Sequence, residues 1–166
     1  MGAYRRAVLG AEAGAIAAGS LEVSFFLLDL VRLRPLATPV ELAGVMPGPA
    51  GVVVDLTSFS GVVDAMWAVY QLGTLTFVHF LAFCLVGVVV SLLFDWRQPF
   101  ESKRLVLLAT LCAGAFLATV AVAGSVLSLG SVGWVPIFGA NVLAAAILGG
   151  SLRLVAGAEA EVAEAA

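Results

Sequence analysis

The sequence predicts an all-α membrane protein in which four transmembrane helices pack as a bundle. Hydrophobic residues make up 62% of the chain and charged residues 11%, and the mean hydropathy is +1.12. Soluble domains contain about 45–50% apolar and about 25% charged residues. A soluble domain of about 150 residues also leaves roughly 30% of its unfolded-chain surface in water. This chain of 166 residues therefore needs lipid as its main solvent, which excludes a soluble enzyme and a nucleic-acid-binding protein.

The second observation is the number of apolar segments that can cross a bilayer. A hydrocarbon core about 30 Å thick requires roughly 20 helical residues, and we expect spans at residues 7–31, 65–94, 105–127 and 134–155. The prolines fall in the connections except Pro136, which lies in the first turn of the last span, where its missing N–H breaks no helical hydrogen bond. Residues 1–158 thus form one four-helix domain, followed by an acidic tail at 159–166.

The distribution of basic residues predicts the orientation of the chain. With the N-terminus inside, six of the eight basic residues lie in cytoplasmic loops or ends, as the positive-inside rule requires. Trp67 and Trp134 then fall at the outer membrane interface and Trp96 at the inner one, as anchors in an aromatic belt. We expect both termini inside, and the rich use of Arg, Ala, Gly, Val and Leu suggests a prokaryotic cytoplasmic membrane.

The first connection, residues 32–64, is a long outer loop that contains four prolines. Structureless loops of this length are uncommon unless they are functional. Two arrangements remain open: a loop packed over the outer end of the bundle, or a short interfacial helix that begins near Thr57 with Ser58 or Ser60 as its cap.

Ionisable groups inside a span are costly, so each is a candidate functional site. The first span contains Glu12, Glu22 and Asp29. Glu22 lies roughly 4–5 Å outward of the middle of the span at about 1.5 Å per residue, whereas Asp29 lies near the outer interface, where we expect it to reach water. On a helical wheel these two acids share a face with small residues that allow close helix packing, namely Ala11, Ala15 and Ala18. Glu22 should therefore point into the bundle.

Three further polar residues lie at a similar predicted depth. They are His79 on the second span, Thr119 on the third and Asn141 on the fourth. With Glu22 they form a candidate polar layer, for which two interpretations remain open. It is either a protonatable site that carries protons or binds a small cation, or a cluster of interhelical hydrogen bonds that fixes the packing.

Cofactor binding is a third possibility for His79, because a neutral imidazole in a dry site suits the metal of a haem or a chlorophyll-type pigment. The chain has no second histidine for a bis-histidine haem, and we expect no cofactor. Cys84 and Cys112 match in predicted depth but have no metal-ligand spacing, so both are expected to be small buried hydrophobic residues. Gly10 and Gly14 have GxxxG spacing, which a chain rich in Ala and Gly often produces by chance.

Nucleotide-binding, serine-hydrolase and zinc-protease motifs are absent from the sequence, and we expect no enzymatic activity. The leading expectation is a non-catalytic accessory or structural subunit of a larger membrane complex or of a homo-oligomer. Its partners would be the lipid bilayer and other membrane subunits or further copies of itself, which contact the small residues Gly139, Ala146 and Gly150 of the last span. The alternatives are a proton- or cation-coupled transporter or channel that uses Glu22 and His79, and a subunit that binds haem or pigment through His79.

Overall fold

The computed structural model describes residues 2–33, 38, 57–94, 96, 101–123 and 134–164. Four long helices account for nearly all of these residues: α1 (Ala3–Val31), α3 (Phe59–Leu93), α4 (Ser102–Ala123) and α5 (Trp134–Glu164). The described residues contain no strand. Each helix is long and apolar enough to cross a membrane. The prediction of an all-α protein with four candidate membrane-spanning helices is therefore confirmed.

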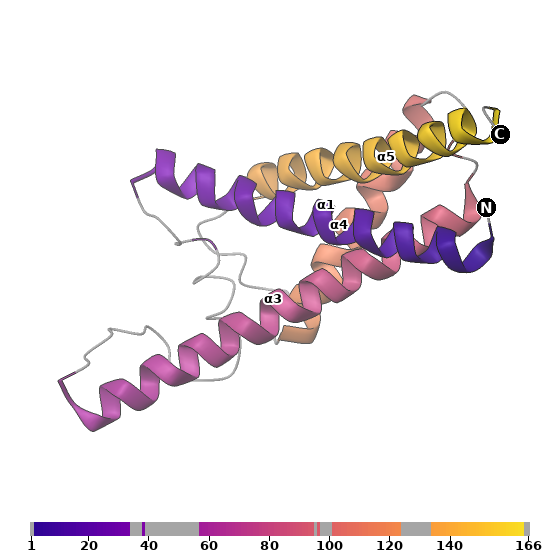
Figure 1. Ribbon diagram of the computed structural model, residues 1–166. Helices are drawn as coiled ribbons and strands as arrows, with labels where there is room; N and C mark the ends of the chain where they lie inside the picture. The colour runs from indigo at the N-terminus through magenta and orange to yellow at the C-terminus, as the bar shows by residue number, and fades with distance from the viewer. Residues whose placement is uncertain are drawn as a thin grey trace.

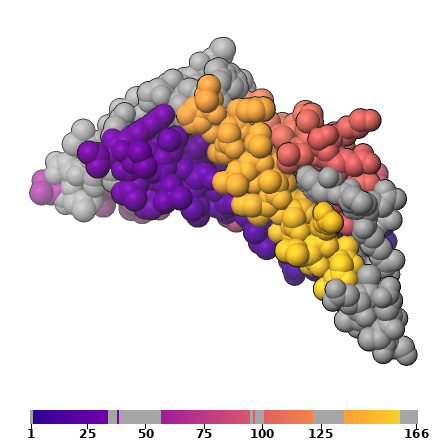
Figure 2. Space-filling model, turned by 90° about the horizontal axis from the view of Figure 1, so that it is seen from above, coloured from indigo at the N-terminus to yellow at the C-terminus, as the bar shows by residue number. Residues whose placement is uncertain are grey.

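The helices form a ring in which α1 and α4 lie diagonally opposite each other. Helix α1 packs on α3 and α5, and α4 packs on the same two helices. From above, α5 runs between α1 and α4 (Figure 2). The start of α1 and the end of α5 lie at the same end of the molecule (Figure 1), so both termini would lie on the same side of a membrane.

The outer surface of the ring carries many large hydrophobic side chains. Large hydrophobic side chains such as Val23, Phe77, Leu85, Val106 and Phe138 are exposed on the four helices. A soluble protein rarely exposes apolar surface of this extent, whereas lipid is its natural solvent. The pattern is that of helices whose inner faces pack together and whose outer faces contact acyl chains.

Glycines bring α1 and α3 into backbone contact. A Cβ atom added to Gly10 would collide with the carbonyl oxygen of Gly87, one added to Gly87 would collide with that of Gly10, and one added to Gly14 would collide with that of Phe83. Only a residue without a side chain permits this approach. The GxxxG pair of α1 is therefore a real packing contact.

A charged clamp holds the same two helices together at the end where the chain begins. Arg6 Nε donates to the carbonyl oxygen of Ser91 at 2.9 Å, and Arg6 Nη2 donates to those of Ser91, Leu92 and Phe94. In return, Ser91 Oγ donates to the carbonyl oxygen of Arg6 at 2.9 Å. The last carbonyls of a helix lack partners within it, and a cation there is favourable. Arg6 thus satisfies the end of α3 from a neighbouring helix.

All four helices extend beyond the spans that the sequence predicts, and α3 and α5 do so by the most residues. Helix α3 begins at Phe59 rather than at residue 65, because Ser58 caps it by accepting a hydrogen bond from the Gly61 N–H at 3.1 Å. The helix expected near Thr57 therefore exists, but it continues into the second span instead of forming a separate interfacial segment. Helix α5 continues to Glu164, through most of the predicted tail, because Ala and Glu are strong helix formers.

The small-residue face of α1 differs from the one expected, whereas that of α5 lies on the outside of the ring, where a partner could contact it. On α1, Ala18 is buried, whereas Ala11 and Ala15 are only half-buried, because the contact face follows Gly10, Gly14 and Leu21 instead. On α5, Gly139 and Ala146 are exposed and Gly150 is half-buried, since the residues that face the ring are Ala140, Asn141, Ala144, Ala145 and Leu148.

The tryptophans also occupy different environments. Trp67 is partly exposed and stacks on Tyr70 with 5.4 Å between the ring centroids. Trp96 is buried, in contrast to an interfacial anchor, and its Nε1 donates to the carbonyl oxygen of Val90 at 3.1 Å. Trp134 is the first residue of α5, and its side chain lies outside the described residues.

Candidate functional site

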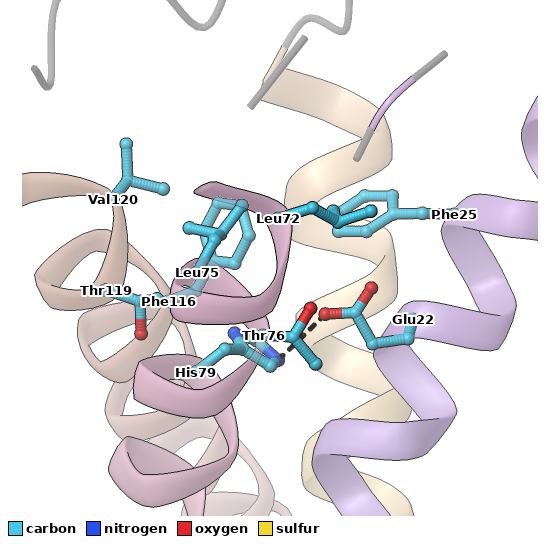
Figure 3. Close-up of a pocket in the computed structure, with 9 residues that line it drawn as sticks. All are labelled: Glu22, Phe25, Leu72, Leu75, Thr76, His79, Phe116, Thr119 and Val120. Carbon is cyan, nitrogen blue, oxygen red and sulfur yellow. Dashed lines mark ion pairs between the residues drawn. The ribbon is translucent and has the colours of Figure 1, made fainter. Parts of the chain in front are cut away.

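A small pocket lies among α1, α3 and α4, at the level where the sequence predicts the polar layer. Its lining residues are shown in Figure 3 and are Glu22, Phe25, Leu72, Leu75, Thr76, His79, Phe116, Thr119 and Val120. The pocket has a volume of about 20 Å³, which is room for one water molecule. It is mainly apolar, and its polar groups are a carboxylate, an imidazole and two hydroxyls.

Glu22 and His79 point toward each other across this pocket (Figure 3). His79 Nε2 lies 4.0 Å from Glu22 Oε1, which is within ion-pair distance but too long for a direct hydrogen bond. The His79 side chain is 3% exposed and that of Glu22 is 35% exposed. The imidazole is thus enclosed by the bundle, while the carboxylate connects the pocket to the outside of the chain.

The His79 ring is held by aromatic neighbours rather than by hydrogen bonds to Nε2. Its centroid lies 4.7 Å from that of Phe83, 6.0 Å from that of Phe116 and 6.3 Å from that of Phe80. Among the described residues, Nε2 has no hydrogen-bond partner. A buried polar atom without a partner is costly, so a water molecule or a shift of the Glu22 side chain toward the ring would stabilise this arrangement.

The other two members of the predicted layer bond within their own helices. Thr119 is buried and lines the pocket, and its Oγ1 donates to the Ala115 carbonyl oxygen at 2.9 Å. Asn141 is fully buried on α5, and its Nδ2 donates to the Ile137 carbonyl oxygen at 2.8 Å. The Asn141 Oδ1 atom has no partner among the described residues, but Asn141 does not line the pocket. The structure thus brings Glu22, His79 and Thr119 around one pocket and leaves Asn141 outside it.

Thr76 is a pocket residue that the sequence analysis missed. Its side chain lies beside the line that joins Glu22 and His79 (Figure 3). It is placed there because residues three apart on a helix lie on the same face. The three-residue spacing between Thr76 and His79 could therefore have indicated from the sequence that Thr76 lies beside His79.

Asp29 occupies a different site from the one expected. It is 1% exposed and does not reach water, because Oδ2 accepts from the Thr38 N–H at 2.6 Å and Oδ1 accepts from the Thr38 hydroxyl at 2.7 Å. Both carboxylate oxygens are thus occupied by a residue of the first connection. Asp29 anchors this connection to the end of α1 and does not contribute to the pocket.

The pocket beside His79 has room for one water molecule, and aromatic rings pack around the imidazole, so the structure shows no porphyrin-sized space at this residue. The described residues also contain no group of three or more His, Cys, Asp or Glu side chains that could hold a metal ion. Cys112 is buried and Cys84 is half-buried, and neither lines the pocket.

Comparison with protein-family models, with curated protein sequences and with solved structures gives no match. The class of the protein is therefore defined by the fold and the site alone. It has four helices long and apolar enough to cross a membrane, as a multi-pass membrane protein would, and Glu22 and His79 form an ionisable pair within the described part of the bundle.

Proposed function

We propose that this is a multi-pass protein of a prokaryotic cytoplasmic membrane, with both termini inside, that binds and releases a proton at the Glu22–His79 pair. The observation that carries this proposal is the 4.0 Å approach of the carboxylate to a buried imidazole nitrogen that has no other partner among the described residues. Ionisable residues within transmembrane helices are rare and costly, and those that pair inside a bundle mark ion pathways and proton relays.

The charge of the pair supports one bound proton as the resting state. With one shared proton the pair is neutral overall, either as carboxyl and imidazole or as carboxylate and imidazolium. Loss of that proton leaves a net negative charge in a low-dielectric site, and gain of a second proton leaves a net positive one. Exchange of the single proton therefore requires water or a replacing cation at the pocket.

The size of the pocket limits what the site can bind. About 20 Å³ accommodates one water molecule but no organic substrate. A proton carried by that water fits the space, and Thr76 and Thr119 place hydroxyl groups beside it. The proposed function is thus proton movement or proton coupling, with the chain acting alone or within an oligomer.

Proton flux into reconstituted vesicles tests the proposal. Purified protein is placed in liposomes that contain a pH-sensitive dye, and a potassium diffusion potential supplies the driving force. We expect acidification with the native chain and its loss, to the level of empty liposomes, in Glu22→Gln and His79→Gln. Glu12→Gln is the matched control, because Glu12 lies on the same helix but is exposed and outside the pocket. Unchanged flux in Glu22→Gln would refute the mechanism.

A second candidate function, an accessory or structural subunit, is favoured by the exposed small-residue face of α5. A Cβ atom added to Gly139 or Gly150 meets no other atom within 4 Å, and Ala146 is exposed between them. Small residues on an outer helix face allow another transmembrane helix to approach closely. A native gel of gently solubilised membranes should show a complex larger than the monomer, and Ala146→Leu should weaken it. A single band at the mass of the monomer would exclude this function.

A further inference from the structure

The two ends of the bundle are built differently on either side of the Glu22–His79 pair. Toward the end where the chain begins, α1 and α3 touch through three successive levels: Gly14 against Phe83, Gly10 against Gly87, and Arg6 against Ser91. Backbone atoms are in contact at the two glycine levels, so no water-sized space remains between these helices.

The rest of the ring is equally closed at this end. Phe83, Val90, Cys112 and Leu148 are 0% exposed there, one or two from each of α3, α4 and α5. On α3, the buried residues that follow His79 are apolar or glycine until Ser91, which is bonded to Arg6. A proton that leaves the pair in this direction meets a dry, fully packed core.

Toward the opposite end, α1 and α3 diverge (Figure 1). Helix α3 is 35 residues long, or about 52 Å at about 1.5 Å per residue, and its first turns extend away from the other helices. Phe59, Met66, Val69 and Tyr70 are more than half exposed, and Gly61 is the one buried residue of the segment 59–70. The segment 59–70 of α3 therefore packs little against the other described helices.

Polar groups lie on the divergent side of the pair. Thr76 lines the pocket, and Gln71 lies on the buried face of α3 two turns before His79 with 5% exposure. The carboxylate side chain of Glu22, at 35% exposure, is the part of the pair that reaches the outside of the chain. On this side Thr76 and Glu22 can hydrogen-bond water, which the buried residues that follow His79 on α3, apolar or glycine until Ser91, cannot do.

We infer that in this conformation the Glu22–His79 pair exchanges protons with water only on the side where α1 and α3 diverge, and that the glycine crossing of these helices closes the other side and must open before a proton crosses the membrane. The inference deepens the proposed function and rests on it for the identity of the cargo. The side of access is measured without any flux, so the two can fail separately.

Thiol labelling with a charged, membrane-impermeant methanethiosulfonate measures access. The reporter is Thr76→Cys in a Cys84→Ala, Cys112→Ala background. Ser60→Cys and Ser102→Cys, at exposed positions, mark the divergent and the closed end respectively. The native Cys84 in a Cys112→Ala background is the closed-end probe, because its Cα lies against Gly14. Each protein is labelled from one side at a time in vesicles, and the modified fraction is measured by mass spectrometry.

We expect the thiol at position 76 to react from the same side as the thiol at position 60, and to show no reaction from the side that labels position 102. Cys84 should react from neither side. If Thr76→Cys fails to fold, Leu72→Cys, another half-buried pocket position, replaces it. Labelling at position 76 from the side of position 102, from both sides, or from neither side overturns the inference. One-sided labelling without proton flux would retain the access route and refute the proposed transport.

Discussion

The backbone contact between α1 and α3 makes a sharp prediction at Gly87. In Gly87→Ala, the new Cβ would collide with the backbone carbonyl oxygen of Gly10 and would also approach the backbone of Gly14. A flexible side chain could rotate away from such a contact, but these are backbone atoms of a helix, so α1 and α3 must separate along their crossing. The Arg6 clamp on the last turn of α3 opposes this separation.

The expected change in the free energy of unfolding of Gly87→Ala follows from two opposing effects. Overpacking of a rigid contact costs about 1–3 kcal/mol, and the upper end applies because neither backbone can move alone. Alanine in a helix interior is favoured over glycine by about 0.8–1.0 kcal/mol. We therefore expect Gly87→Ala to lower the free energy of unfolding by about 2 kcal/mol, which corresponds to a melting temperature lower by about 4–8 °C for a chain of this size.

Gly73→Ala is the matched control on the same helix. A Cβ added there meets nothing within 4 Å, so only the gain in helix propensity remains. A thiol-reactive fluorescent dye measures both variants in detergent, because Cys112 is buried and Cys84 half-buried in the folded chain and both become reactive on unfolding. A melting temperature for Gly87→Ala at or above that of the native chain, or an equal decrease in Gly73→Ala, would refute the reasoning.

Three further contacts give predictions that the same thermal assay checks. Arg6→Ala should destabilise by about 2 kcal/mol, because it removes charged hydrogen bonds worth about 1.5–3 kcal/mol, whereas Ala at the exposed Arg153 should have no effect; equal effects would contradict the clamp. Asp29→Asn should cost about 1–2 kcal/mol, because one of its two acceptors is replaced by a donor, and Thr38→Val should cost less, since the Thr38 N–H remains. Ser58→Ala should cost about 1 kcal/mol through loss of the cap and should speed amide exchange at Gly61; unchanged exchange there would argue against this cap.

The helices could be predicted from composition because lipid imposes a strict rule on the chain. A backbone in hydrocarbon must satisfy its own hydrogen bonds, so each long apolar segment becomes a helix. The ends of the helices follow no such rule. Helix α3 begins at Phe59 because a single serine hydroxyl caps it, and α5 continues to Glu164 because local propensity outweighs the loss of hydrophobicity.

The depth of a polar residue along its helix could be predicted from the sequence, but the residue that its side chain contacts could not. Counting residues along each helix placed Glu22, His79 and Thr119 at one level, and the structure brings them around one pocket. The same count could not exclude Asn141, because its direction depends on how α5 is rotated about its axis. Asp29 was misplaced for a related reason: its partner Thr38 belongs to a connection that has no periodicity to analyse.

The direction of the α1 contact face likewise depended on how that helix is rotated about its axis. A helical wheel on α1 selects the stripe that contains Ala11 and Ala15, but close packing against α3 needs glycine rather than alanine, and this turns Gly10 and Gly14 toward the neighbour. Small residues therefore identify a helix as one that packs closely. They do not show which of its faces does so when the whole helix is rich in Ala and Gly.

The polar side chains of the buried layer differ in how completely their own helices satisfy them, and this difference singles out the pair. Thr119 and the Asn141 amide nitrogen bond to carbonyl oxygens one turn away, so packing alone accounts for them. The Asn141 Oδ1 and His79 Nε2 atoms are left without hydrogen-bond partners among the described residues, but Oδ1 can only accept, and Asn141 does not line the pocket that contains Glu22. Nε2 faces a carboxylate across a space for one water molecule. A proton added between these two groups removes an unsatisfied atom and leaves the pair neutral, so the free energy of the bundle favours its binding there more than at any other described group of the layer.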